Sequence, residues 1–291
     1  MTSFAGLTLD RPRIMGVINV TPDSFSDGGL RFDHARAIDH GLRLRSEGAD
    51  ILDIGGESTR PGAVAIDPDE ELRRVLPVVR GLARGGSLIS IDTRHAAVMR
   101  AAIGEGAAIV NDVSALRDDP DSIATVAASR APVILMHRRG MAVGTFHGPA
   151  YGDVVEDVRT FLLERAAACL AAGIERSAIA LDPGIGFGKN VNENLQLILG
   201  VPRLADTGFP VLIGASRKSF LGLLTAVEDP ADRLGGSLAV AVEAVRRGAA
   251  ILRVHDVAAT RQALIVAQAF NTIEQGGSAF PPPETAVVSA S

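Results

Sequence analysis

Residues 50–92 read DILDIGGESTRPGAVAIDPDEELRRVLPVVRGLARGGSLISID, and this stretch contains one complete strand–helix–strand unit. The runs at 50–55 and 87–92 are short and rich in β-branched residues, which is typical of strands buried on both faces. Residues 68–84 between them have a helical pattern. The stretch therefore predicts an α/β protein in which strands alternate with helices.

The same unit recurs along the chain. The strands are expected at 13–19, 50–55, 87–92, 108–112, 132–137, 178–182, 210–216 and 250–256. The helices are expected at 33–48, 68–84, 95–106, 121–130, 153–173, 192–206, 235–248 and 257–274, and glycines stand near five of their ends: Gly48, Gly106, Gly173, Gly208 and Gly248. Eight such units predict a single-domain (β/α)8 TIM barrel over residues 13–274, with a doubly wound open sheet as the alternative.

The two ends of the chain do not belong to these units. Residues 1–12 precede the first strand, and we expect them to cover the bottom of the barrel. Residues 275–291 are rich in Gly, Pro and Ser without periodicity, which predicts a disordered tail. The N-terminus has no secretory signal pattern, and no apolar run is long enough to span a membrane.

Composition excludes several classes of protein. The net charge of −5 argues against nucleic acid as the main partner, because neutralising phosphates needs a basic face. Cys169 is the only cysteine, so no intrachain disulfide can form, which fits a reducing cytoplasm. The six histidines show no zinc-binding spacing, and the chain has no GxSxG motif. DPGIGFGK at 182–189 is not a phosphate-binding P-loop, because Asn190 follows Lys189; we interpret it as a flexible loop.

Every predicted strand ends in polar or ionisable residues. They are Asn19, Asp53, Asp92, Asn111, Asp112, His137, Asp182, Ser216, Arg217, Lys218, Arg253, His255 and Asp256. Barrel enzymes place their sites at these carboxyl ends, so we expect a polar ligand in the barrel mouth. The acids suit a planar heterocycle with N–H donors, while Lys218, Arg253 and His255, together with Arg60, suit an anion. The combination predicts a heterocycle that carries phosphate.

Single residues also have structural interpretations. We interpret Asp53 as a residue that orients the following loop through local backbone hydrogen bonds, and Asp256 as a cap of the last helix. Arg217 is expected to pair with a neighbouring acid, and His137 is either a rim residue or a core histidine. Phe25 lies in a Gly-rich polar loop, a position suited to covering a flat ligand. Asn19 and nearby loop oxygens suit Mg2+ bound together with ligand phosphates.

The motifs at successive strand ends resemble the dihydropteroate synthase family over residues 13–274. They are IMGVINVTPDSFSDGG, DIGGESTRPGA, SIDT, NDVS, LMH, LDPGIGFGK, GASRKSFLG and LRVHDV. This family joins 4-aminobenzoate to 6-hydroxymethyl-7,8-dihydropterin pyrophosphate, using Mg2+ and releasing pyrophosphate. One departure is the segment HRRGMAVGTFHGPAYGDV at 137–154, where the family usually has a short Gly-x-Pro loop; we expect it at the rim.

The resemblance implies a role for each matching residue. The pterin would contact Asp92, Asn111, Met136, Asp182, Phe187 and Lys218. Asn19 would help to bind Mg2+, and the pyrophosphate would contact Thr59, Arg253 and His255. The aminobenzoate pocket would consist of Phe25, Arg60, Pro61 and Ser219. Catalysis would rest on Lys218, Arg253 and His255 in a dissociative displacement without a covalent enzyme intermediate.

Two other functions share the barrel and a pterin pocket. A pterin-binding methyltransferase would lack the GESTRPG and SRKSF elements that this chain has, and a non-catalytic pterin-binding paralogue is disfavoured by the retained Asn19, Arg60, Lys218 and His255. The resemblance also implies a cytoplasmic homodimer that associates through its last helices and is a sulfonamide target. Neither nucleic acid nor a membrane is an expected partner.

Overall fold

The computed structural model describes residues 2–21, 30–58, 63–140 and 151–278. Its main sheet has eight parallel strands in the order β8-β7-β6-β5-β4-β3-β10-β9. The strands are β3 (Arg13–Asn19), β4 (Ile51–Gly55), β5 (Ile89–Asp92), β6 (Ile109–Asp112), β7 (Val133–Met136), β8 (Ile179–Asp182), β9 (Leu212–Ile213) and β10 (Ile251–Val254). A parallel bridge between Leu181 and Val211 joins β8 to the residues before β9 and closes the sheet into a barrel. This closure confirms the TIM barrel and excludes the open sheet.

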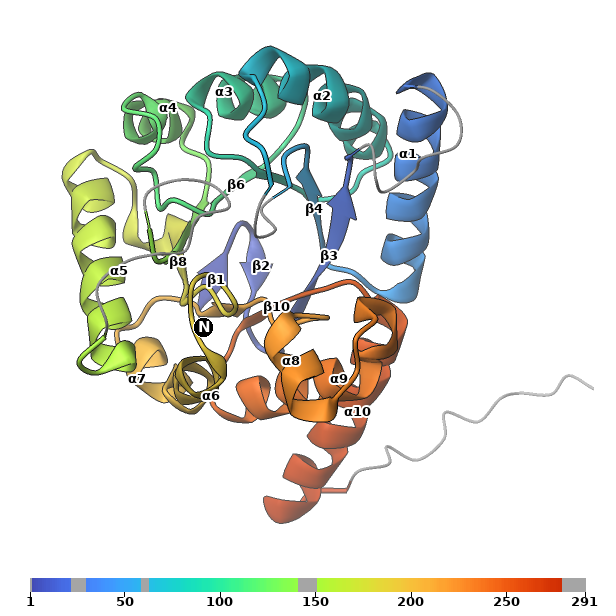
Figure 1. Ribbon diagram of the computed structural model, residues 1–291, viewed down its shortest axis with the longest axis vertical. Helices are drawn as coiled ribbons and strands as arrows, with labels where there is room; N and C mark the ends of the chain where they lie inside the picture. The colour runs from blue at the N-terminus through green and yellow to red at the C-terminus, as the bar shows by residue number, and fades with distance from the viewer. Residues whose placement is uncertain (1, 22–29, 59–62, 141–150, 279–291) are drawn as a thin grey trace, which may run out of the picture.

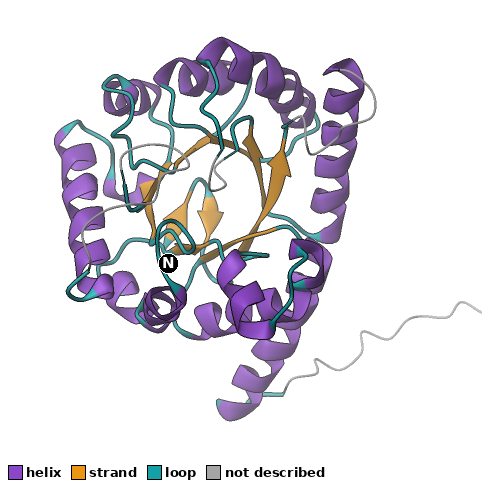
Figure 2. Cartoon of the chain, viewed as in Figure 1, coloured by secondary structure: helices purple, strands orange, loops and turns teal. Residues whose placement is uncertain are grey.

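The helices form an outer ring around the strands (Figures 1 and 2). They are α1 (Leu30–Glu47), α2 (Pro68–Arg84), α3 (Ala96–Gly104), α4 (Ser122–Ser129), α5 (Val154–Ala171), α6 (Val191–Leu199), α7 (Val201–Ala205), α8 (Ser219–Thr225), α9 (Leu234–Arg246) and α10 (Val257–Glu274). The helix predicted at 192–206 is two helices, because Pro202 lacks the N–H that would continue α6. The short helix α8 was not predicted, and β9 is shorter than expected.

The glycines expected at helix ends have the left-handed backbone that such caps require. The φ angles are 107° at Gly48, 107° at Gly106, 89° at Gly173, 80° at Gly208 and 103° at Gly248. These glycines end the helices that lead into the next strand.

An apolar cluster fills the amino-terminal end of the barrel. It contains residues from the amino-terminal part of the strands: Met15, Ile51, Ile109, Ile134, Ala180, Leu212 and Ile251. Phe4 joins this cluster from the antiparallel hairpin β1 (Ser3–Phe4) and β2 (Leu7–Thr8), and its side chain is buried. The hairpin appears inside the ring of strands in Figure 1. Because this end is apolar, a site for a polar ligand has to lie at the opposite, carboxyl-terminal end, here called the barrel mouth.

Candidate active site

Arg253 on β10 connects the polar side chains inside the barrel mouth. Its Nε donates to Oδ2 of Asp53 on β4 at 2.6 Å, and its Nη2 donates to Oδ2 of Asp92 on β5 at 2.8 Å. Asn111 on β6 donates through Nδ2 to the same Asp53 oxygen at 3.1 Å. Side chains from four strands therefore form one hydrogen-bonded group.

The position of Asp53 corrects the sequence interpretation. We expected a residue that bonds to its local backbone, but its side chain is fully buried and bonds to Arg253, 200 residues away. Its Oδ1 has no hydrogen-bond partner within the described part of the chain. Asp53 thus anchors Arg253 rather than orienting the loop that follows β4.

The buried charges of this group shift one another's pKa. Burial raises the pKa of Asp92 to about 7; Arg253 opposes this shift, and Asp53 adds to it. Burial acts to lower the pKa of Arg253, but Asp53 and Asp92 outweigh it and the net pKa is raised. Arg253 is therefore always charged, and Asp92 binds a proton more readily than an exposed aspartate does.

Asp182 and the loop after β8 form a second part of the mouth. Oδ1 of Asp182 accepts a hydrogen bond from the backbone N–H of Gly184 at 2.7 Å, and burial raises the pKa of this carboxyl to about 6. Gly184 has φ +68°, and a Cβ at this position would lie 1.9 Å from the carbonyl oxygen of His137. Only glycine fits here, so the close approach of two loops explains the DPG sequence.

Lys189 holds this loop from inside. Its Nζ donates to the carbonyl oxygens of His137, Gly184 and Phe187 at 3.2, 2.8 and 3.3 Å. Three bonds use all three ammonium donors. We interpreted DPGIGFGK as a flexible loop. That interpretation missed Lys189, which hydrogen-bonds this loop to His137 at the end of β7. The only signal for this role was a lysine among glycines.

Lys218 completes the mouth on the side of β9. Its Nζ lies 4.0 Å from the centroid of the Phe187 ring, in a cation–π contact. Burial lowers the pKa of Lys218 to about 8; Arg253 adds to this shift, and Asp182 and Asp92 oppose it. Lys189 and Lys218 are the only lysines in the sequence, and both lie in this region.

The residue before Lys218 has a strained backbone. Arg217 has φ +60°, a conformation that costs free energy in any residue with a side chain. Its backbone N–H donates to Oγ of Ser237 at 2.9 Å, and its guanidinium donates to Asp256 at 3.0 and 2.5 Å. The expected pairing of Arg217 with an acid is confirmed. Asp256 does occupy the N-cap position of α10, as expected, but its side chain makes this ion pair and no cap hydrogen bond.

His255 lies beside Ser216 at the end of β10. The distance from its Nδ1 to Oγ of Ser216 is 3.1 Å, and its backbone N–H donates to the same oxygen at 3.3 Å. Burial, followed by the charges of Arg253 and Arg217, lowers the pKa of His255 to about 3. The ring is therefore neutral near pH 7, and it can donate a hydrogen bond to an anion but adds no positive charge. Ser216 was one of the polar strand-end residues in the sequence, but no role was assigned to it.

The remaining candidates lie around this group. Met136 is buried at the end of β7, Asn19 is half-buried at the end of β3, and Ser219 is exposed at the start of α8. His137 is a core histidine: its ring makes an edge contact with Phe161 at 4.9 Å, and burial lowers its pKa to about 2. Four predicted site residues lie outside the described residues: Phe25, Thr59, Arg60 and Pro61. Residues 141–150 of the atypical loop also lie outside them.

The barrel mouth combines buried carboxylates with lysine and arginine, side chains that suit a polar ligand with both N–H donors and negative charge. The family model described as pterin binding enzyme matches residues 15–255. The chain belongs to this family of pterin-binding enzymes.

Named relatives narrow the family further. The dihydropteroate synthase of Neisseria meningitidis serogroup C is 49% identical over 259 residues, which cover 88% of this chain and 92% of that relative. The structure of Xanthomonas albilineans dihydropteroate synthase with 4-aminobenzoic acid is 53% identical, with a TM-score of 0.86 over 91% of this chain and 95% of that one. The same enzyme with 7,8-dihydropteroate is 50% identical, with a TM-score of 0.83 over the same shares of the two chains.

Proposed function

We infer that the protein is a dihydropteroate synthase. It condenses 6-hydroxymethyl-7,8-dihydropterin pyrophosphate with 4-aminobenzoate to give 7,8-dihydropteroate and pyrophosphate. The observation that carries this function is the mouth in which Asp182, Lys218 and Phe187 stand beside the Arg253–Asp92 pair, in a chain about half identical to dihydropteroate synthases that bind 4-aminobenzoate and dihydropteroate.

Asp182 is the carboxylate that we assign to the pterin. A carboxylate matches an N–C–NH2 edge with two parallel hydrogen bonds, and the N–H of Gly184 fixes its orientation beforehand. Asp92, Asn111 and Lys218 surround the ring with further hydrogen-bonding groups. Met136 and Phe187 provide apolar contacts to its faces. Because burial raises the pKa of Asp182 to about 6, the N–H donors of the pterin would relieve an unfavourable buried charge.

The pyrophosphate is assigned to Arg253, His255 and Thr59. Arg253 uses two of its five N–H donors for Asp53 and Asp92, which leaves three that could bind the pyrophosphate. Neutral His255 donates a hydrogen bond from the ring nitrogen that does not face Ser216. Both groups are set before the ligand arrives, which favours stabilisation of charge that develops on the leaving group.

Magnesium fits this site as an ion that enters with the pyrophosphate. The described residues contain no group of three or more His, Cys, Asp or Glu side chains arranged to hold a metal. The amide oxygen of Asn19 is a hard donor, and Mg2+ often takes few protein ligands besides phosphates and water. When bound, Mg2+ would neutralise part of the charge of the departing pyrophosphate.

The displacement needs no covalent enzyme intermediate. The bond between the pterin methylene carbon and the pyrophosphate oxygen breaks with its electron pair, and the pterin ring delocalises the positive charge left on carbon. The aminobenzoate nitrogen then attacks this carbon and loses a proton. Arg253 and His255 hold the leaving group, while Asp182 and Lys218 hold the ring. Phe25, Arg60, Pro61 and Ser219 are assigned to the aminobenzoate, so sulfonamides, which mimic it, should compete with it.

Product formation from the two substrates tests this function. Incubation of the purified protein with dihydropterin pyrophosphate, 4-aminobenzoate and Mg2+ should release dihydropteroate and pyrophosphate in equal amounts. A protein that binds the pterin but forms no product would be the non-catalytic paralogue. Methyl transfer from a folate derivative would instead identify a methyltransferase.

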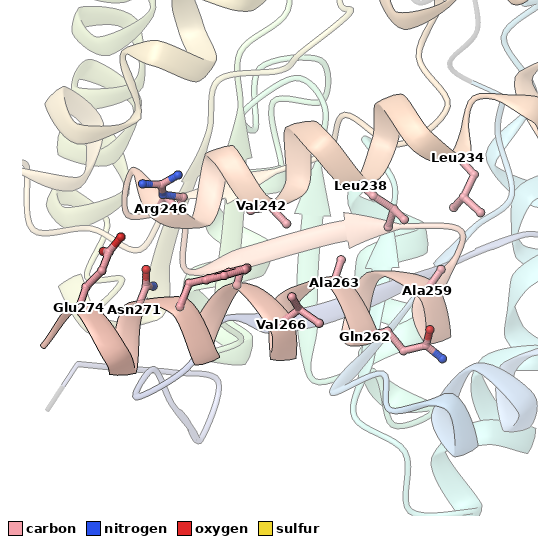
Figure 3. A pocket seen from close by; sticks show the side chains of 12 residues that line it. Leu234, Leu238, Val242, Arg246, Ala259, Gln262, Ala263, Val266, Asn271 and Glu274 are labelled. Atoms are coloured by element: carbon pink, nitrogen blue, oxygen red, sulfur yellow. The ribbon is translucent and has the colours of Figure 1, made fainter. Parts of the chain in front are cut away.

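We further propose a homodimer through α9 and α10. A groove with a volume of about 770 Å3 lies between these helices. Figure 3 shows side chains of both helices that line it. Val266, Phe270 and Ile273 of α10 are more than half exposed, which is unusual for such large apolar side chains. A second copy covering this face would bury them. Sedimentation should give a dimer for the native chain and a monomer for Phe270→Glu; a native monomer would refute the proposal.

The protein is proposed to act in the cytoplasm. Among the described helices, none has the length and apolarity needed to cross a membrane. The buried thiol of Cys169 is compatible with a reducing compartment, and burial raises its pKa to about 11. Fractionation of cells producing the native chain would test this location.

A further inference from the structure

Charged side chains outside the ligand-binding group connect four consecutive loops of the barrel mouth. Each residue follows a different strand, in the order β4, β5, β6 and β7. The signs alternate along this chain of ion pairs, so its formal charge is zero. Its members are Glu57, Arg94, Asp118 and Arg138.

The contacts between neighbouring members are direct. Nε and Nη2 of Arg94 donate to Oε2 and Oε1 of Glu57 at 2.8 and 3.1 Å, a two-pronged arrangement that fixes both planes. Nη1 of Arg94 lies 3.6 Å from Oδ2 of Asp118. Nη2 of Arg138 donates to both carboxylate oxygens of Asp118 at 2.5 and 2.7 Å.

Burial distinguishes this chain of ion pairs from ordinary surface ion pairs. The side chains of Glu57 and Asp118 are 6% and 9% exposed, and those of Arg94 and Arg138 are 16% and 2% exposed. Water screens such pairs weakly, and removing one partner leaves the other as a poorly solvated charge. The loops that carry these residues are therefore held in a fixed relative position.

Glu57 also joins the two described ends of the loop after β4. Its Oε1 accepts a hydrogen bond from the backbone N–H of Ile66 at 3.0 Å. Beside it, the carbonyl of Gly56 accepts from Nη1 of Arg74 on α2 at 3.0 Å. One carboxylate thus connects residue 57, residue 66 and, through Arg94, the loop after β5. In the sequence, Arg60 and Pro61, which the proposed function assigns to aminobenzoate, fall between these two ends.

We propose that Glu57 and Arg94 are positioning residues that set the affinity for 4-aminobenzoate. They do so by fixing residues 57 and 66 against the loops that follow β5, β6 and β7. The inference rests on the proposed function, because it takes the aminobenzoate to bind beside this segment. Glu57 and Arg94 need not touch either substrate, and the pterin group of Arg253, Asp92 and Asp182 has its own contacts.

The test is a comparison of the two substrates in the full-length protein. Arg94→Met keeps a long side chain but removes the bonds to Glu57 and Asp118. The KM for 4-aminobenzoate should rise at least about tenfold, because small displacements of binding groups have large effects on affinity. The Kd for pterin pyrophosphate, measured by calorimetry without aminobenzoate, should change less than about twofold. Arg94→Lys, which keeps the charge, should recover part of the loss.

Arg80→Met is the matched control. Arg80 on α2 makes a two-pronged pair with Glu105, 2.6 Å for each bond, at the amino-terminal side of the barrel. Its side chain is more exposed than that of Arg94, 47% against 16%. Like the Arg94–Glu57 pair, the Arg80–Glu105 pair joins consecutive strand–helix units, but it lies away from the barrel mouth. This variant should leave both substrate constants unchanged.

Two results would contradict the positioning role of Glu57 and Arg94. An unchanged aminobenzoate KM in Arg94→Met would overturn the inference, and so would an equal loss of pterin affinity, which would indicate a general structural role. If Arg94→Met does not fold, Glu57→Gln decides by the same comparison, because it keeps the acceptor for Ile66 and removes the charge. Failure of the native protein to form dihydropteroate would refute the proposed function itself, before any variant is compared.

Discussion

Asp53 shows how a buried charge is maintained at a single residue. Its carboxylate is fully buried, and the hydrogen bonds from Arg253 and Asn111 replace the water that it loses on folding. The same bonds direct Arg253 toward Asp92. A change at Asp53 should therefore affect both the folded state and the ligand site.

Asp53→Asn should lower both stability and pterin affinity. Breaking a buried ion pair costs about 3–5 kcal/mol of unfolding free energy, and the Kd for pterin pyrophosphate should rise about tenfold or more because Arg253 loses its orientation. Chemical denaturation and calorimetry measure the two effects. Asp50→Asn is the control: Asp50 pairs with Arg11 and Arg13 before β4, so it should lower stability and leave ligand affinity unchanged. Native affinity in Asp53→Asn would contradict this role.

Asp182 makes the unliganded protein less stable at neutral pH. Burial raises its pKa from 3.8 to about 6, so the folded state binds more protons than the unfolded state within this window. Its contribution to stability is fully present below pH 3.8 and is lost as the pH rises through about 6. The charge is retained because the proposed pterin contact needs a carboxylate.

Asp182→Asn should therefore stabilise the free protein and abolish pterin binding. An asparagine keeps the oxygen that accepts from Gly184, so at pH 8 the unfolding free energy should rise by about 1–3 kcal/mol. Thermal unfolding should show a higher Tm at pH 8 and a difference that shrinks toward pH 4. A lower Tm at pH 8 would show that the charged form is favoured in the free protein.

At the scale of elements, the loop between β8 and α6 depends on Lys189. The loop passes close to the end of β7, and Lys189 satisfies three carbonyl oxygens that would otherwise be buried beside each other. Asp182 stands at one side of this loop, and Phe187 lies within it. The loop is therefore part of the pterin site, although Lys189 itself is covered.

Lys189→Met should weaken pterin binding through this loop. The methionine fills similar space but removes the donor to His137, while the carbonyls of Gly184 and Phe187 keep backbone N–H donors, so the change should cost about 1–3 kcal/mol of unfolding free energy. We expect the Kd for pterin pyrophosphate to rise about tenfold. Arg176→Met is the control, because Arg176 donates to the carbonyl of Thr207 at the amino-terminal side of the barrel. Equal affinities for the two variants would show that the loop keeps its position without Lys189.

The elements were largely predictable from the sequence because their signals are local. Buried parallel strands are continuous apolar runs, and the glycines at 48 and 248 mark helix ends where a left-handed residue is needed. The exceptions have local causes that the periodicity does not show. Pro202 divides the helix predicted at 192–206, and α8 is only seven residues long.

At the scale of the whole molecule, the barrel explains why the residues of the site were predictable and their partners were not. Strand ends meet at one edge of any such barrel, so polar residues at those ends must gather there. Which side chains bond to each other depends on three-dimensional packing. Asp53 and Arg253 are 200 residues apart, and nothing in the sequence near either residue identifies the other.

The distribution of lysine in the molecule allows a chemical test of the site. Lys189 and Lys218 are the only lysines, so an amine-selective reagent has two side-chain targets besides the N-terminus. Burial lowers the pKa of Lys218 to about 8 and that of Lys189 to about 7, so both amines are partly neutral at pH 8. Exposure therefore has to distinguish them, and the side chain of Lys218 is only half-buried. Lys189 is 9% exposed and uses its three donors on backbone carbonyls.

Acetylation of the folded protein at pH 8 should therefore modify Lys218 and spare Lys189. Pterin pyrophosphate should protect Lys218, because the proposed ligand covers its amine, and the loss of synthase activity should follow the modification of this residue. Peptide mass spectrometry measures both sites. In guanidinium the two lysines should react at the same rate, which would show that the fold causes the difference. Equal labelling of both lysines in the folded protein, or labelling of Lys218 that the pterin does not slow, would contradict the placement of Lys218 in the pterin site.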